Sequence, residues 1–100
     1  MAYQASALEA TLAAAAGHDT ALMDELRAVF RESVARQVDL LSRARCDGNW
    51  QVAAQRLKGL ASSFQAWPLL DLADEAVEAA PGDPVVLRKL HGFLDSFHPQ

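Results

Sequence analysis

The sequence contains one cysteine, Cys46, among its 100 residues. A single cysteine excludes a disulfide within the chain and leaves a cysteine-rich zinc site without its ligands. Histidine does not replace those ligands, because neither His18 nor His98 has a second ligand four residues away along a helix. We therefore expect no metal site.

Positive charge is also scarce. The chain has 9 lysine and arginine residues against 13 aspartate and glutamate residues, a formal net charge of −4 at pH 7. Proteins that bind nucleic acid neutralise phosphates with a surplus of lysine and arginine, and acidic membrane surfaces attract the same residues. We therefore expect neither nucleic acid nor a membrane surface as a partner.

Long hydrophobic runs are missing as well. No run approaches the roughly 20 apolar residues that cross a bilayer. The alanine-rich start of the chain lacks the basic region of a secretory signal, because Glu9 interrupts it and the first basic residue is Arg27. We expect the protein to stay in the cytoplasm.

Glycine and proline are few, with 5 and 4 residues, while hydrophobic residues make up 51% of the chain. This composition is typical of one globular domain over residues 1–100, with enough length for one modest core. We expect Gly17 and Gly48 to close helices in the left-handed conformation, and aspartate or proline to begin the helices that follow. The breaks between helices lie at residues 17–19, 47–49, 67–68 and 81–84.

Between the breaks, apolar residues recur three or four positions apart, as on one face of an α-helix, and no stretch alternates at a period of two like a strand. The expected helices span residues 20–45, 50–64, 68–80 and about 84–97. Short connections favour antiparallel neighbours, so the sequence predicts an all-α fold, an antiparallel up-down four-helix bundle over residues 20–97. Residues 1–18 would add a short N-terminal helix and turn over one end, with Leu8 and Leu12 docked on the bundle.

The expected helix over residues 50–64 carries a row of polar and small residues. At about 100° per residue, Lys58, Gly59 and Ser62 fall within about 60° of Gln55 around the helix. Leu57 points mostly elsewhere, toward the bundle interior. We therefore predict that the row of Gln55, Lys58, Gly59 and Ser62 faces water.

Gly59 lies in the middle of this helix, where glycine costs up to about 1 kcal/mol relative to alanine. A partner that approaches the helix closely at Gly59, beside the cation of Lys58, would explain the residue. The alternatives are a tolerated defect, or a glycine that makes room for a neighbouring helix of the same chain.

The same helix contains a motif that is similar to a known one. Residues 54–66 read AQRLKGLASSFQA and resemble the signature of histidine-containing phosphotransfer (HPt) domains, roughly His-x-Leu-Lys-Gly followed by small residues and later by Gly-Ala. Residues 47–50 are similar to the loop and aromatic residue before that motif, and residues 20–45 to the family's long second helix. The resemblance covers about residues 22–97. The matching motif positions are Leu57, Lys58, Gly59, Ala61 and Ala66.

The central residue of the motif departs from the family, because Gln55 occupies the position of the phosphoacceptor histidine. An imidazole can attack a phosphoryl group through the lone pair of its unprotonated nitrogen, whereas the lone pair of an amide nitrogen is delocalised. We therefore expect Gln55 to carry no phosphate and the protein not to be an enzyme. A second departure is Gln65, where the family commonly has glycine before Ala66.

The resemblance implies a docking partner, namely the receiver domain of a response regulator or of a hybrid histidine kinase. Gln55 keeps amide donors and a carbonyl acceptor for such a contact. The long helix folds back beside the motif helix, which would bring Arg36 or Arg43 near Gln55, and basic side chains suit the acidic pocket of a receiver. We expect a monomer without a cofactor, although a bound receiver would bring its own magnesium. The expected partner-binding residues are Gln55, Arg56, Lys58, Gly59, Ser62, Arg36 and Arg43.

Other interpretations stay open. The chain is an ordinary phosphorelay HPt protein if Gln55 replaces a natural histidine, and a general helical interaction or structural protein if receiver binding has been lost. His91 is a candidate substitute phosphoacceptor, but the Lys-Gly arrangement is not rebuilt around it. The arginines also fit a scatter of solubilising charge. The acidic residues Asp71, Asp74, Glu75 and Glu78 are typical of a solvated helix face.

Overall fold

The computed structural model describes the backbone of residues 2–97 and the side chains of residues 7–97. The described chain consists of helices and connecting turns without a strand, so the predicted all-helical class is confirmed. The helices are α1 (Ala2–Ala16), α2 (Thr20–Arg43), α3 (Asp47–Phe64), α4 (Trp67–Glu78) and α5 (Pro84–Ser96).

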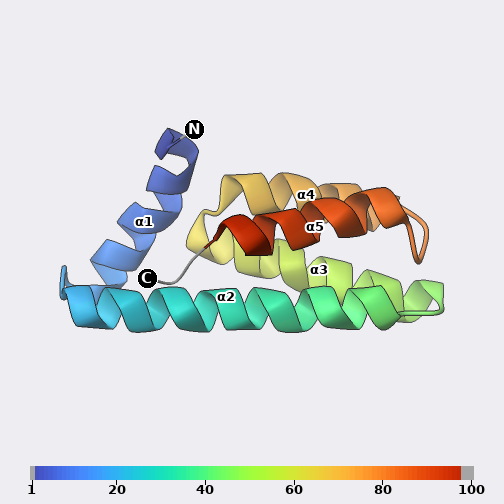
Figure 1. Cartoon of the computed structure of the whole chain (residues 1–100), viewed down its shortest axis with the longest axis horizontal. Helices are drawn as coiled ribbons and strands as arrows, with labels where there is room; N and C mark the ends of the chain where they lie inside the picture. The colour runs from blue at the N-terminus through green and yellow to red at the C-terminus, as the bar shows by residue number, and fades with distance from the viewer. Residues whose placement is uncertain (1, 98–100) are drawn as a thin grey trace.

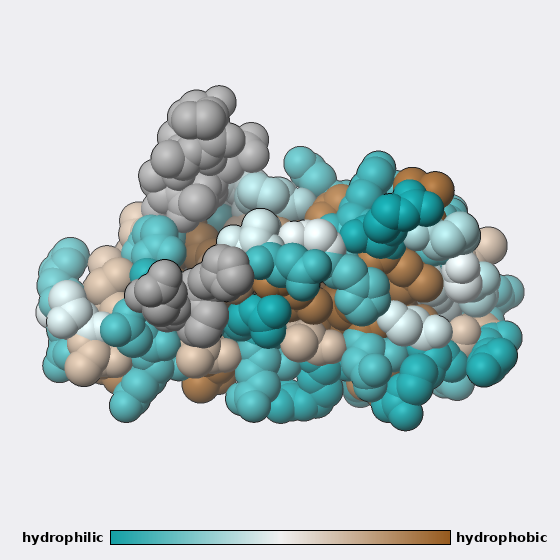
Figure 2. Space-filling model, in the orientation of Figure 1, coloured by the Kyte–Doolittle hydropathy of each residue, from teal (hydrophilic) through white to brown (hydrophobic). Residues whose placement is uncertain are grey.

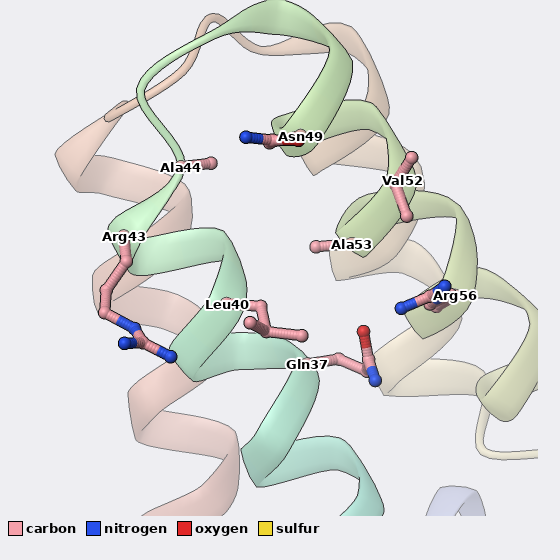
Figure 3. Close-up of a pocket in the computed structure, with 8 residues that line it drawn as sticks. All are labelled: Gln37, Leu40, Arg43, Ala44, Asn49, Val52, Ala53 and Arg56. Atoms are coloured by element: carbon pink, nitrogen blue, oxygen red, sulfur yellow. The ribbon is translucent and has the colours of Figure 1, made fainter.

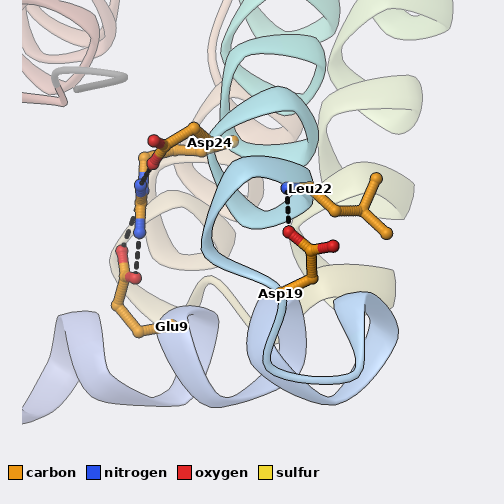
Figure 4. A network of polar contacts seen from close by, with 5 residues as sticks. Glu9, Asp19, Leu22 and Asp24 are labelled. Carbon is orange, nitrogen blue, oxygen red and sulfur yellow. Dashed lines mark hydrogen bonds and ion pairs between the residues drawn. The ribbon is translucent and has the colours of Figure 1, made fainter.

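The starts of α2 and α5 follow from local chemistry that the sequence predicts. The Asp19 carboxylate accepts a hydrogen bond from the Leu22 backbone N–H at 3.1 Å, and so caps α2 (Figure 4). The Asp83 carboxylate accepts one from the Val85 backbone N–H at 2.9 Å, and Pro84 occupies the first turn of α5. Each cap satisfies a backbone donor that the first helical turn leaves unpaired.

The boundary between α2 and α3 differs from the prediction. Helix α2 ends at Arg43 rather than at residue 45, and α3 begins at Asp47 rather than at residue 50. Gly48 lies inside α3 and is not left-handed, so the prediction that it closes the preceding helix was wrong, whereas Gly17 does have a positive φ of 63°. Cys46 is the N-cap without a side-chain cap bond, and Asp47 stands in the first turn, where a carboxylate favours the helix dipole.

Four of the helices pack lengthwise. Helix α2 contacts α3 and α5, and α4 contacts the same two helices. The α2–α3 and α4–α5 turns lie at one end of the molecule and the α3–α4 turn at the other (Figure 1). This arrangement is compatible with the expected helical bundle. On the face shown in Figure 2, hydrophilic side chains cover much of α2 and α5, with hydrophobic ones between them.

The core lies between these four helices. The largest fully buried side chains include Trp50, Phe30, Leu57 and Leu69. The Trp50 indole N–H donates a hydrogen bond to the Ala76 carbonyl at 2.8 Å, which satisfies the one polar group of this buried side chain. The bond also ties α3 to α4 and so fixes the helix that carries the motif.

Helix α1 leans away from the other four and is attached at one end of the molecule (Figure 1). It contacts α2, α3 and α4, and Leu8 and Leu12 are buried there, as the sequence predicts. The Glu9 carboxylate pairs with the Arg27 guanidinium of α2, which also bonds Asp24 at 3.0 Å (Figure 4). The hydrogen bonds that the Arg27 guanidinium donates to the Glu9 carboxylate raise the pKa of Arg27, so the cation is held more firmly.

Candidate functional site

The predicted polar row on α3 is on the surface. Gln55, Lys58, Gly59 and Ser62 are exposed, whereas Leu57 between them is buried. The prediction that this row faces water is confirmed. We call these four exposed residues the α3 row.

Lys58, at one edge of the α3 row, forms an ion pair with α4. Its Nζ atom lies 3.1 Å from Oδ1 of Asp74, and the two side chains are 46% and 52% exposed. Exposed pairs of this kind contribute about 0–1 kcal/mol, since water competes for both charges. The Lys58 ammonium is therefore easily released to an acidic group of another molecule.

A groove runs along the other edge of the row, between α2 and α3, and we call it the α2–α3 groove. Its two hollows share Gln37 of α2 and Arg56 of α3. The first hollow, toward the α2–α3 turn, is lined by Gln37, Leu40, Arg43, Ala44, Asn49, Val52, Ala53 and Arg56 (Figure 3). The second is lined by Ser33, Arg36, Gln37, Arg56, Gly59, Leu60, Ser63 and Phe64.

The structure divides the predicted partner-binding residues between the row and the groove. Arg36, Arg56 and Gly59 line one hollow together. Arg43 shares the other hollow with Arg56, although it also pairs with Asp39 at 3.0 Å on the exposed side of α2. Gln55 lines neither hollow. Arg36 and Arg43 each share a hollow with Arg56, the residue next to Gln55 in the chain, but not with Gln55 itself.

Gly59 joins the two parts, because it belongs to the row and lines the groove. A Cβ atom added there would meet nothing within 4 Å. The interpretation that Gly59 makes room for a neighbouring helix of the same chain is therefore wrong. Its backbone is also not left-handed, so alanine would fit this position without strain.

The groove contains features that the sequence analysis missed. Leu40 and Val52 are 38% and 49% exposed, although Leu40 follows the apolar spacing of α2. The Gln37 Oε1 atom is buried without a hydrogen-bond partner, and it points into the first hollow near Arg56 (Figure 3). A buried acceptor left unpaired is costly, so a donor beside this atom would be favoured.

The other titratable groups form no comparable site. His91 is exposed on α5, and Glu75 of α4 pairs with Lys89 of α5 at 3.2 Å. Within the described residues, no three side chains of histidine, cysteine, aspartate or glutamate gather as a metal site would require. None of the described helices combines the length and the hydropathy needed to span a membrane.

Comparisons with protein-family models, with curated proteins and with solved structures each gave no match. The relationship to HPt domains thus stays a prediction that depends on the motif over residues 54–66 and on the exposure of its residues.

Proposed function

We propose that this chain is an HPt-like signalling protein that binds the receiver domain of a response regulator or hybrid histidine kinase without carrying phosphate. In this proposal α2 to α5 form the antiparallel up-down bundle of that family. The observation that carries it is the exposure of Gln55 in one row with Lys58 and Gly59, at the positions where the motif has its functional residues.

The Gln55 side chain ends in an amide that can reach a docked receiver, but the lone pair of its nitrogen is delocalised and not nucleophilic. Its amide donates and accepts hydrogen bonds but does not form a phosphoramidate under conditions in which imidazole does. The proposed action is therefore occupancy, in which the chain competes with a true phosphotransfer protein or holds a receiver in one state.

Charge supports a receiver as the partner. Receivers present an acidic pocket, and the exposed Lys58, Arg56 and Arg36 place positive charge on the row and the groove. The chain as a whole has a net charge of −4, so this basic surface is a local feature and not a consequence of composition. Complementary charge of this kind accelerates encounter and selects the partner.

The test is a calorimetric titration of the chain against a panel of receiver domains. We expect saturable binding by at least one receiver and weaker binding by Lys58→Ala, with a larger loss at low salt because screening removes part of the ionic contribution. Lys89→Ala is the matched control, since Lys89 pairs with Glu75 across α4 and α5 much as Lys58 pairs with Asp74.

Two outcomes contradict the proposal. Absence of saturable binding by every receiver leaves the general helical interaction protein as the better interpretation. Equal loss of affinity in Lys58→Ala and Lys89→Ala shows that binding does not use the α3 row.

A further inference from the structure

Helix α2 exposes an apolar stripe that no part of the described chain covers. Leu22, Val29 and Leu40 are 39%, 57% and 38% exposed. They fall within about 20° of one another around the helix at about 100° per residue. Helix α2, which carries these residues, extends along most of the length of the molecule (Figure 1).

Charged residues flank this stripe in an ordered way. Glu25, Glu32, Arg36 and Arg43 are all exposed, and all lie about 30° to 75° from the middle of the stripe on the same side of α2. The two acidic residues come first along the helix and the two basic residues second. Figure 3 shows the Arg43 side chain on the side of α2 away from α3, outside the contact between the two helices.

We propose that α2 pairs with α2 of a second copy of this chain, antiparallel about a two-fold axis that passes beside residue 34. In an antiparallel pair, the flank of one helix faces the same flank of the other. Glu32 and Arg36 lie two residues on either side of residue 34, and Glu25 and Arg43 lie nine residues on either side. Each acidic residue of one copy therefore faces a basic residue of the other.

The apolar residues match the same register. Val29 and Leu40 lie five and six residues from position 34, so each Val29 meets the partner's Leu40 on both sides of the axis. Ser33, next to the axis, is small and half-buried, which lets the two backbones approach closely. Val52 of α3, 49% exposed, lines the same hollow as Leu40 and extends the apolar contact.

A second copy fits better than an unrelated chain, because one register satisfies both ion pairs and both apolar contacts at once. The exposed apolar area is modest, so we expect the dimer to be a weak one. This inference goes beyond the proposed function and does not depend on it, although the two interfaces share Arg36 and the hollow that Leu40 and Val52 line, so a dimer and a receiver would compete for this surface. It also revises the expectation of a monomer from the sequence.

Sedimentation velocity over a concentration series tests the proposal through charge reversal. We expect a concentration-dependent dimer for the unmodified chain and at least about tenfold weaker association for Glu32→Arg or Arg36→Glu, because each change places two like-charge contacts in the symmetric interface. The double variant E32R/R36E restores opposite charges across the axis and should recover association to within about threefold of the unmodified chain.

Control variants reverse charge at exposed sites on other helices. Glu78→Arg on α4 and Arg88→Glu on α5 match the two single changes and should leave association unchanged. If Glu32→Arg or Arg36→Glu lacks the helical circular dichroism of the unmodified chain, Glu25→Arg and Arg43→Glu provide a second charge swap farther from the axis.

Three results overturn the proposal. The first is a monomer at every concentration of the series, up to about 500 µM, where even a weak dimer with a dissociation constant of about 100 µM would be populated. The second is a dimer that the single reversals do not weaken. The third is a double variant that stays as weak as the singles, since the antiparallel register predicts recovery.

Discussion

At the scale of single residues, the α3 row was the most predictable part of the molecule. Helical spacing alone places Gln55, Lys58 and Ser62 on one side and Leu57 on the other, and the structure agrees. The ion pair of Lys58 with Asp74 was not predictable, because it depends on the rotation of α4 against α3. The buried Oε1 atom of Gln37 is a tertiary feature of the same kind.

Gly59 gives a residue-scale prediction, because a methyl group at this position has open space around it. Gly59→Ala should raise the free energy of unfolding by up to about 1 kcal/mol, since alanine loses less backbone entropy in a helix. The same change should weaken binding to a receiver that approaches the helix closely. Urea denaturation and calorimetric titration measure the two effects.

The Gly59→Ala prediction is specific because the free energy of unfolding should rise while the affinity for a receiver falls. A variant that is more stable and binds equally well would show that the glycine is a tolerated defect and not a docking feature. A variant that is less stable would contradict the open space around this position.

At the scale of helices, the periodic spacing predicted which segments are helical better than it predicted where they begin. The caps at Asp19 and Asp83 follow from side chains with a strong preference for that position. The start of α3 could not be predicted in this way. Cys46 occupies the N-cap position without a side-chain hydrogen bond, and Asp47 suits both a cap and a first turn. The spacing also does not tell which flank of α2 lies against α3, so the exposure of Leu40 was missed.

The end of α3 is the place of one departure from the HPt motif, Gln65. Gln65 adopts a left-handed conformation with φ of 57° and ψ of 38°, and its backbone N–H bonds the carbonyls of Ala61 and Ser62. Glycine takes this conformation without the steric cost that a side chain incurs. The position where the family commonly has glycine is thus one where the backbone of this chain favours it.

This geometry gives an element-scale prediction. Gln65→Gly should raise the free energy of unfolding by about 0.5–1 kcal/mol, the relief of left-handed strain less the entropy that glycine adds to the unfolded chain. Gln55→Gly, the same change in the middle of α3, should lower it by a similar amount. Urea denaturation of both variants checks the signs, and a loss of stability in Gln65→Gly would contradict this explanation of the helix end.

At the scale of the whole molecule, the all-helical class and the single core follow from composition and spacing, whereas the α2–α3 groove does not. Its hollows lie between α2 and α3 and share Gln37 and Arg56, and no local pattern encodes how the two helices pack there. The surface proposed for receivers thus combines a predictable row with a groove that only the packed helices create.

The most direct measurement of the central claim is transfer of labelled phosphate from a phosphorylated receiver that binds the chain. We predict that the unmodified chain gains no acid-labile phosphate, and that Gln55→His gains it at residue 55, because an imidazole there would stand on the exposed α3 row beside Lys58. Arg88→His, at an exposed position on α5 outside the proposed docking surface, is the control and should stay unlabelled. Phosphate on the unmodified chain, for example on the exposed His91, would contradict the account.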